Sequence, residues 1–369
     1  MKKLWICLTL LLFAMTFKGG AVPTFAEDGE IGENYVVYNE DDEVLIEKSA
    51  VEEGDTFITK DFYEYKVHKL EGHKGYAKRI GRINVPEIKR DDLNKYGISL
   101  FNNIRETDYK KICMYMTHND ESYRPSDGYD SVYGVGGVHD VAKAFKSQLE
   151  GKGISVVLNE TLHIPHDSNA YTRSNSTANK LFSSEYPDAM FDIHRDGVSK
   201  SFYYTKQDGK DLSKIRIVVG KSNPYFDDNY KFAQTVFAIG NSMYPWLFSD
   251  IYCGKGHYNQ AFMPTALLFE MGTYLIEKEY VYNTLPYLAE VVNTALYQSK
   301  TEENGDITVD ESVSETAQSP VVDPEPYDQP RDNGLAIGLG ITIPILVLGG
   351  GTVAYCLYYK SQSDKKNKK

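Results

Sequence analysis

The chain has 369 residues, a formal net charge of −12 at pH 7 and a hydrophobic content of 41%. This length allows one medium-sized domain with smaller additions, and the acidic charge excludes the basic surface of a nucleic-acid-binding protein. Only four cysteines occur, so the chain is not a disulfide-rich scaffold. For the two in the central part, Cys113 and Cys253, one disulfide and two buried thiols are equally compatible with the sequence.

The start of the chain has the features of a secretory signal peptide. Two lysines precede an apolar run that extends to Phe17, and the small residue Ala26 follows at the expected cleavage point. We therefore predict a signal peptide over residues 1–26 and an exported protein.

Residues 34–90 predict a small β-rich domain. Short stretches of branched and aromatic residues alternate there with polar turns, at 36–38, 44–46, 56–58, 65–67 and 76–80. Such spacing favours a small barrel or sandwich. No residue in it suggests chemistry, so a binding or spacer role is expected.

Residues 105–300 predict the main domain, in which strands and helices alternate. Strands are expected from Ile112 onward and at 154–158, 189–193, 215–219 and 266–269, with helices at 139–149, 171–182, 227–243 and 284–299. This alternation implies an α/β fold with a mostly parallel mixed sheet and helices on both faces. The glycine-rich run 134–137 lacks the strand–turn–helix setting of a phosphate-binding loop.

The C-terminal part predicts a membrane anchor. Residues 301–333 are acidic and rich in Ser, Thr and Pro, which is typical of a disordered linker. Residues 335–359 carry no charge and exceed the about 20 apolar residues of a transmembrane helix. The basic tail 360–369 is then cytoplasmic by the positive-inside rule. We predict a protein anchored in the cell membrane by this helix, with its catalytic domain on the outer face.

Three of the predicted strands end in residues that can bind or assist a metal ion. His118 and Glu121 lie in the polar turn after the first strand, His194 follows 189–193 and Glu270 follows 266–269. Ligands bind at the carboxyl ends of strands in open α/β sheets. His118, Glu121 and His194 supply a nitrogen, oxygen, nitrogen set for Zn²⁺, with the fourth position left to water. The metal lowers the pKa of that water to about 7, and Glu270 is expected to act as the catalytic base.

Other polar residues near these strand ends are weaker candidates. Arg195 and Arg173 are predicted to bind a substrate carboxylate through their paired N–H donors, and either one could instead be the partner that a buried Glu270 requires. His163 is predicted to contact substrate, and one of His163 and His166 could donate to a transition-state oxyanion or serve as an alternate metal ligand. Solvated loop histidines and surface ion pairs are the alternatives.

The chain resembles the stage II sporulation protein P family over about residues 108–300. The matching segments, in the same order and spacing, are 115–123, 161–163, 171–174, 192–196, 258–260 and 266–272. The resemblance implies an exported hydrolase with a zinc-amidase fold of the phosphorylase/hydrolase-like kind. Its motif histidines fall on His118 and His194 and its late glutamate on Glu270, whereas Glu121 matches less directly, because related amidases draw their glutamate from a helix.

The resemblance also implies a reaction and partners. The substrate is peptidoglycan, cut at the amide between N-acetylmuramic acid and the L-alanine of the stem peptide, with cleavage of peptide cross-links as a further activity. The implied setting is engulfment during sporulation, beside a lytic transglycosylase and a membrane scaffold protein.

Two features depart from the family pattern and leave other functions open. Met116 stands where the family often has the first histidine of His-Thr-His, and a C-terminal span replaces the usual N-terminal anchor. The second departure favours wall remodelling outside engulfment. A zinc metallocarboxypeptidase uses a similar His-x-x-Glu and later His, and a non-catalytic peptidoglycan-binding surface protein is the remaining alternative.

Overall fold

The computed structural model describes residues 34–83, 110–167 and 169–298. Outside this part lie the predicted signal peptide, linker, transmembrane helix and basic tail, at residues 1–26, 301–333, 335–359 and 360–369.

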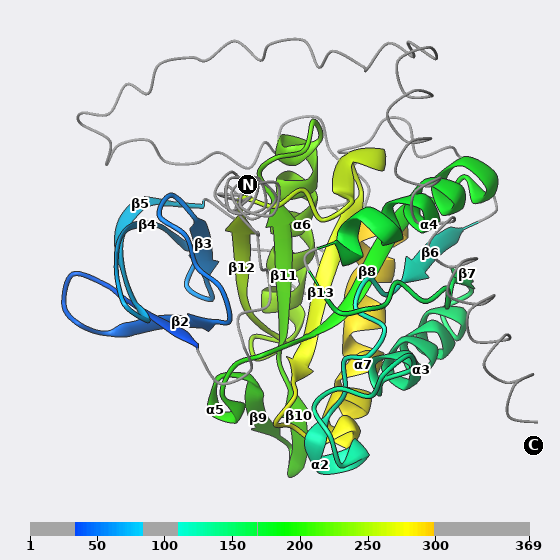
Figure 1. Cartoon of the computed structure of the whole chain (residues 1–369), viewed down its shortest axis with the longest axis horizontal. Coiled ribbons are helices and arrows are strands. Elements are labelled where there is room, and N and C mark those ends of the chain that lie inside the picture. The colour runs from blue at the N-terminus through cyan, green and yellow to red at the C-terminus, as the bar shows by residue number, and fades with distance from the viewer. Residues whose placement is uncertain (1–33, 84–109, 168, 299–369) are drawn as a thin grey trace, which may run out of the picture. The chain divides into compact units, whose positions relative to one another are not determined.

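The first described part is β-rich, as the sequence predicted (Figure 1). Its strands are β1 (Tyr35–Tyr38), β2 (Val44–Lys48), β3 (Thr56–Thr59), β4 (Tyr63–Glu71) and β5 (Lys74–Arg82). They lie in the order β2-β1-β5-β4-β3. Alternate residues point inward and bury one apolar cluster, which includes Val37, Ile46, Phe57, Val67 and Ala77.

The second part contains the central sheet, which is mixed and mostly parallel. Its strands are β6 (Lys111–Tyr115), β7 (Ser155–Leu158), β8 (Ala189–Asp196), β11 (Ile215–Gly220), β12 (Phe248–Gly254) and β13 (Ala266–Thr273), in the order β12-β11-β13-β8-β6-β7. β8 runs parallel to both β6 and β13, whereas β11 runs antiparallel to β13. The carboxyl ends of β6, β8 and β13 therefore meet at one edge.

Helices cover both faces of this sheet, as predicted (Figure 1). Ile112 and Met114 of β6 face the core under α3 (Val138–Glu150), α6 (Phe226–Met243) and α7 (Lys278–Asn293). Cys113 and Tyr115 face the other way, toward α4 (Ala170–Glu185). The shorter elements are α2 (Arg124–Asp127), α5 (Lys200–Tyr203), the hairpin β9 (Tyr204–Gln207) and β10 (Lys210–Ser213), the 3-10 helix η2 (Gln260–Phe262) and the π-helical turn η3 (Thr294–Gln298).

The β-rich part and the central sheet are joined by strand pairing. β3 runs antiparallel to β12, with Thr59 opposite Asp250 and Thr56 opposite Cys253, so the described strands form one 11-stranded sheet and a separate hairpin. β12 was not among the predicted strands, because Ser249 and Asp250 interrupt its apolar pattern. The pairing matters because it brings the end of β2 to the central sheet.

The described helices correct the predicted location. None of the helices in residues 34–83, 110–167 and 169–298 is long and apolar enough to cross a membrane. The longest of them, α6, has 18 residues and includes Asp227, Asp228 and Lys231, whereas a membrane helix needs about 20 predominantly apolar residues. The prediction of an exported protein anchored in the cell membrane, with its catalytic domain on the outer face, is therefore wrong on this finding.

The alternatives left open for the two central cysteines are now decided. Cys113 and Cys253 are both free and buried. Burial raises the pKa of each thiol to about 12, so neither is a reactive thiolate near neutral pH.

Candidate metal centre and active site

The carboxylate of Glu121 lies between two imidazole rings. Its Oε1 atom is 3.3 Å from Nδ1 of His118 and 3.4 Å from Nδ1 of His194. The two ring centroids are 5.0 Å apart, and all three side chains are buried. The structure therefore brings together the three residues proposed as metal ligands. His194 lies within β8 rather than beyond its end.

Close backbone packing fixes the turn that carries His118 and Glu121. The carbonyl oxygen of Glu121 accepts a hydrogen bond from the N–H of Val138 at 3.0 Å. A Cβ atom at Gly136 would lie 2.2 Å from that same oxygen, so only glycine fits there. The glycine-rich run 134–137, for which no function was predicted, allows this turn to pack against the start of α3.

A second carboxylate lies beside His194. Asp192 Oδ1 is 3.1 Å from Nε2 of His194 and also accepts the N–H of Thr117 at 2.8 Å. Nε2 of His194 has no hydrogen-bond partner among the described residues, so its contact with Asp192 is an ion pair and not a hydrogen bond. Burial opposes a positive charge on His194, but Asp192 and Glu121 outweigh it and raise the pKa of His194 well above its ordinary value.

The electrostatics of Glu121 suit a cation. Burial raises the pKa of this carboxyl group, but His194, His118 and Arg195 outweigh burial and hold the pKa well below its usual range. Its Oε2 atom accepts the backbone N–H of Arg195 at 2.9 Å. Glu121 is therefore ionised, with Oε1 directed at the two histidines.

A third imidazole, from His166, competes with His194 as a ligand. The ring of His166 stacks on His118 with centroids 4.1 Å apart, and its Nδ1 atom is 2.8 Å from Asp120 Oδ1. His118, Glu121 and His166 each offer a ligand atom within 4.8 Å of the others. The side chain of His166 is 23% exposed and that of His194 3%. Sequence reasoning named His166 only as an alternate ligand.

Glu270 lies beside this cluster, with one oxygen engaged and the other not. On β13 it is opposite His194 of β8. Its Oε1 atom accepts a hydrogen bond from Lys48 Nζ at 3.1 Å, whereas Oε2 is buried and has no hydrogen-bond partner among the described residues. Burial raises the pKa of Glu270 to about 7, although Lys48 opposes the shift. A carboxylate with this pKa can take and return a proton near neutral pH.

The partner of Glu270 was missed by the sequence analysis, which considered Arg173 and Arg195. Lys48 is the last residue of β2 and is 1% exposed. Because lysines are almost always exposed, no local pattern marks this one. The β-rich part, which was expected to have no chemistry, therefore contributes a side chain to the site.

Lys48 belongs to a buried set of charges that we call the Lys48 network. Its Nζ atom is 3.5 Å from Asp196 Oδ1 as well as 3.1 Å from Glu270. Asp196 also pairs with Arg216, whose Nε atom is 2.8 Å from Asp250 Oδ1. The network consists of Lys48, Asp196, Arg216, Asp250 and Glu270, all at most 4% exposed.

The three residues predicted to bind substrate make contacts within the protein. Arg195 donates to two backbone carbonyl oxygens in the loop 122–130. Arg173 donates from Nε to the carbonyl oxygen of His163 at 2.6 Å. Both ring nitrogens of His163 are hydrogen-bonded within the protein, and burial lowers its pKa. These contacts support the loops around the centre, and a role in substrate binding stays a prediction.

Comparison with known proteins identifies the family. A sequence model of the stage II sporulation protein P (SpoIIP) family matches residues 26–293. The chain belongs to this family. Stage II sporulation protein P of Bacillus subtilis (strain 168) is 30% identical over 184 residues, which are 45% of this chain and 46% of that protein. The match thus spans about half the length of this curated relative.

Solved structures of amidases show a more distant likeness. The N-acetylmuramoyl-L-alanine amidase from Clostridium difficile 630 has 16% identity and a TM-score of 0.33, over 50% of this chain and 96% of that one. The CwlD amidase from Clostridioides difficile, in complex with the GerS lipoprotein, has 12% identity and a TM-score of 0.35, over 51% of this chain and 95% of that one. The N-acetylmuramyl-L-alanine amidase Ami1 from Mycobacterium smegmatis has 12% identity and a TM-score of 0.35, over 51% of this chain and 96% of that one. TM-scores below 0.5 do not establish a shared fold.

Met116, at the position where the resemblance predicts a histidine, does not take part in the cluster. Met116 is fully buried in the apolar core on the α3 and α7 side of β6. His118, Glu121 and His194 come together without a side chain from position 116. A second motif histidine is therefore not required to assemble this cluster.

Proposed function

We propose that this SpoIIP-family protein is a zinc-dependent peptidoglycan hydrolase that cuts the amide between N-acetylmuramic acid and the L-alanine of the stem peptide. The convergence of His118, Glu121, His194 and Glu270 at one edge of the sheet carries the proposal. That edge holds the carboxyl ends of three mutually parallel strands, where α/β enzymes bind their ligands. Family membership supports a role in sporulation.

The residues present fit a zinc ion. Two imidazoles and one ionised carboxylate are a ligand set that catalytic zinc uses, and the pairing of Asp192 with His194 is the support such ligands have. Bound zinc would polarise the scissile carbonyl and lower the pKa of a water molecule. We assign His118, Glu121 and His194 as ligands and His166 as the competing imidazole.

The chain's own residues supply the proton transfers. Glu270 takes a proton from the attacking water and returns it to the leaving amine, for which a pKa of about 7 is suitable. Lys48 holds Oε1 of Glu270 and so leaves Oε2 for this exchange. The β-rich residues 34–90 and the catalytic residues 105–300 then act as one unit, because β3 pairs with β12. A lytic transglycosylase and a membrane scaffold protein are the partners we propose.

Two measurements test this function. Zinc content is determined by elemental analysis, and products released from purified sacculi are identified by mass spectrometry. We expect Glu270→Gln to keep zinc and lose at least about a hundredfold in release, while Glu53→Gln, at an exposed position, matches the unchanged protein. Equal release by Glu270→Gln would refute the assignment.

The same products separate the alternative functions. An amidase releases stem peptides with a free L-alanine amine. A metallocarboxypeptidase releases single amino acids, and a binding protein sediments with sacculi without releasing either.

A further inference from the structure

A cavity of about 250 Å³ adjoins the metal centre, between the end of β2 and the loop that follows β12. The residues that matter for its chemistry are Lys48, Glu52, Asp55, Tyr171, Lys255 and Tyr258. The ring of Tyr171 lies 5.4 Å from that of His118 and 6.2 Å from that of His194, and Lys48 contacts Glu270. A ligand in this cavity would therefore lie beside the proposed metal ligands and Glu270.

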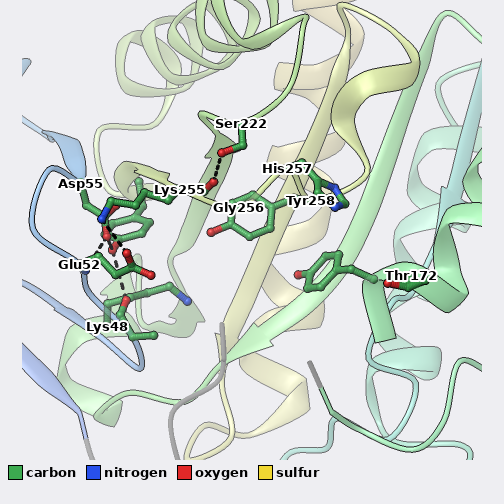
Figure 2. A pocket seen from close by; sticks show the side chains of 13 residues that line it. Lys48, Glu52, Asp55, Thr172, Ser222, Lys255, Gly256, His257 and Tyr258 are labelled. Atoms are coloured by element: carbon green, nitrogen blue, oxygen red, sulfur yellow. Dashed lines mark hydrogen bonds and ion pairs between the residues drawn. The ribbon is translucent and has the colours of Figure 1, made fainter. Parts of the chain in front are cut away.

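One side of the cavity carries charges of both signs. Figure 2 shows Lys48, Glu52, Asp55 and Lys255 gathered there. Lys255 and Glu52 form an ion pair of 2.7 Å whose side chains are 46% and 44% exposed. Because an exposed pair of this kind is worth little, a ligand can exchange with either partner.

Asp55 differs from Glu52 and Lys255 on this side of the cavity because its carboxyl group is buried. It is 2% exposed, and its Oδ2 atom accepts hydrogen bonds from Tyr252 and from the backbone N–H of Glu52. Its Oδ1 atom is buried and has no hydrogen-bond partner among the described residues. A buried carboxylate oxygen without a donor costs free energy, which a ligand's ammonium group would recover.

The opposite side is aromatic and is held in a strained backbone. The rings of Tyr171 and Tyr258 have centroids 5.6 Å apart. Tyr258 and Asn259 have φ angles of 44° and 49°, which non-glycine residues rarely adopt, and such strain is often kept where it positions a binding group. A Cβ atom at Gly256 would meet the Tyr258 ring at 2.3 Å, so glycine is required for this placement of the ring.

We propose that this cavity binds an amino-acid head group, with an ammonium and a carboxylate, on a short aliphatic stem. The ammonium pairs with the carboxylate of Asp55, the carboxylate pairs with Lys255, and the stem lies against Tyr171 and Tyr258. A neutral sugar would leave Asp55 without a cation. The inference rests on the proposed function in one respect: it takes the ligand from the same substrate, in which a diamino acid of the stem peptide presents such a head group.

Three soluble probes test the proposal by calorimetric titration of the full chain. The first is a stem tripeptide that ends in diaminopimelic acid. The second ends in lysine and so keeps the side-chain ammonium but lacks the second carboxylate. The third is peptide-free glycan strands. We expect the first probe to bind about tenfold more tightly than the second, for one charged hydrogen bond, and the third to bind independently of this cavity.

Two variants assign the two charges. Lys255→Met is expected to weaken the first probe about tenfold and leave the second unchanged. Asp55→Asn is expected to weaken both. Lys180→Met, on the exposed face of α4, is the matched control and should change neither. Because Lys255 lies at the rim, its variant remains informative even if Asp55→Asn folds poorly.

Three results would overturn the inference: equal binding of the first probe by Lys255→Met and the unchanged protein, no binding of either peptide, or loss of glycan binding in these variants. The peptides have no amide to muramic acid, so binding is measured apart from hydrolysis. If the peptides bind as expected while sacculi stay intact, the amidase function fails and the binding site stands; the reverse result rejects the site alone.

Discussion

The proposed metal centre and the Lys48 network lie side by side, but the chain assembles them in different ways. Glu121 lies in the turn after β6, and His194 lies in β8, the strand parallel to β6. Lys48 and Glu270 are 222 residues apart and are brought together by contacts between the β-rich part and the central sheet, among them the β3–β12 pairing. His194 and Asp196 alternate on β8 and so share a face, which links the two groups. The proposed metal centre is built from residues that a local sequence pattern predicts, whereas the Lys48 network is built by contacts between distant parts of the chain.

The largest effect is expected from breaking the metal centre. His118→Ala removes one of the three proposed ligands, so we expect zinc to fall below about 0.1 per chain under conditions in which the unchanged protein holds about one. In metal-free protein the same variant should unfold at nearly the same urea concentration as the unchanged protein. Zinc content and urea unfolding in the presence of a chelator measure the two quantities. Retention of full zinc would place the centre elsewhere.

A matched pair of variants identifies the third ligand. If His194 binds the metal, His194→Ala loses zinc and His166→Ala retains it, since only His194 is both fully buried and supported by Asp192. The opposite pattern would transfer the role to His166, which the distances also allow. Loss of zinc in both variants would mean that both rings bind.

Breaking the Lys48 network should instead cost stability. Arg216→Met leaves Asp250 buried without the arginine that pairs with it and leaves Asp196 with Lys48 alone, and breaking a buried pair costs about 3–5 kcal/mol. The free energy of unfolding is measured by urea titration of metal-free protein. Arg124→Met, which breaks a half-exposed pair with Asp130, is the control and should cost less than about 1 kcal/mol. Equal stability of the two variants would show that the network is not structural.

Lys48 connects the network to the chemistry, so its variants should give an intermediate effect on activity. We expect Lys48→Met to lower release from sacculi about 10- to 100-fold with zinc retained, and Lys48→Arg to restore part of it. Lys48 lowers the pKa of Glu270, so its removal raises that pKa further. If the ionised base is needed, the acid limb of the pH–rate profile moves to higher pH. An unchanged profile and rate would assign Lys48 to folding alone.

The same contrast explains what the sequence could predict. Apolar patterns in the sequence predict the strands of the central sheet except β12, and the helices α3, α4, α6 and α7. The polar residues after the apolar runs predict the candidate site residues His118, Glu121, His194 and Glu270. The partner of Glu270 was not predicted, because a lysine after a strand is normally solvated and its burial depends on the β3–β12 pairing. The position of His166 against His118 depends on how the loop 163–167 folds back. Side chains brought together by long-range pairing leave no local pattern.

The smallest effect concerns the two buried thiols, one on each side of this comparison. Cys113 lies in β6 below the metal centre, and Cys253 lies in β12 opposite Thr56 of β3. With pKa values of about 12, both should react with iodoacetamide at least about a hundredfold more slowly than a free thiol.

Lys48→Met weakens the contact between the β-rich part and the central sheet, so it should speed labelling of Cys253 more than that of Cys113. Site-resolved mass spectrometry after timed labelling gives both rates. Equal acceleration of the two would indicate that the β3–β12 pairing opens only with the whole sheet, and that the two parts fold as one cooperative unit.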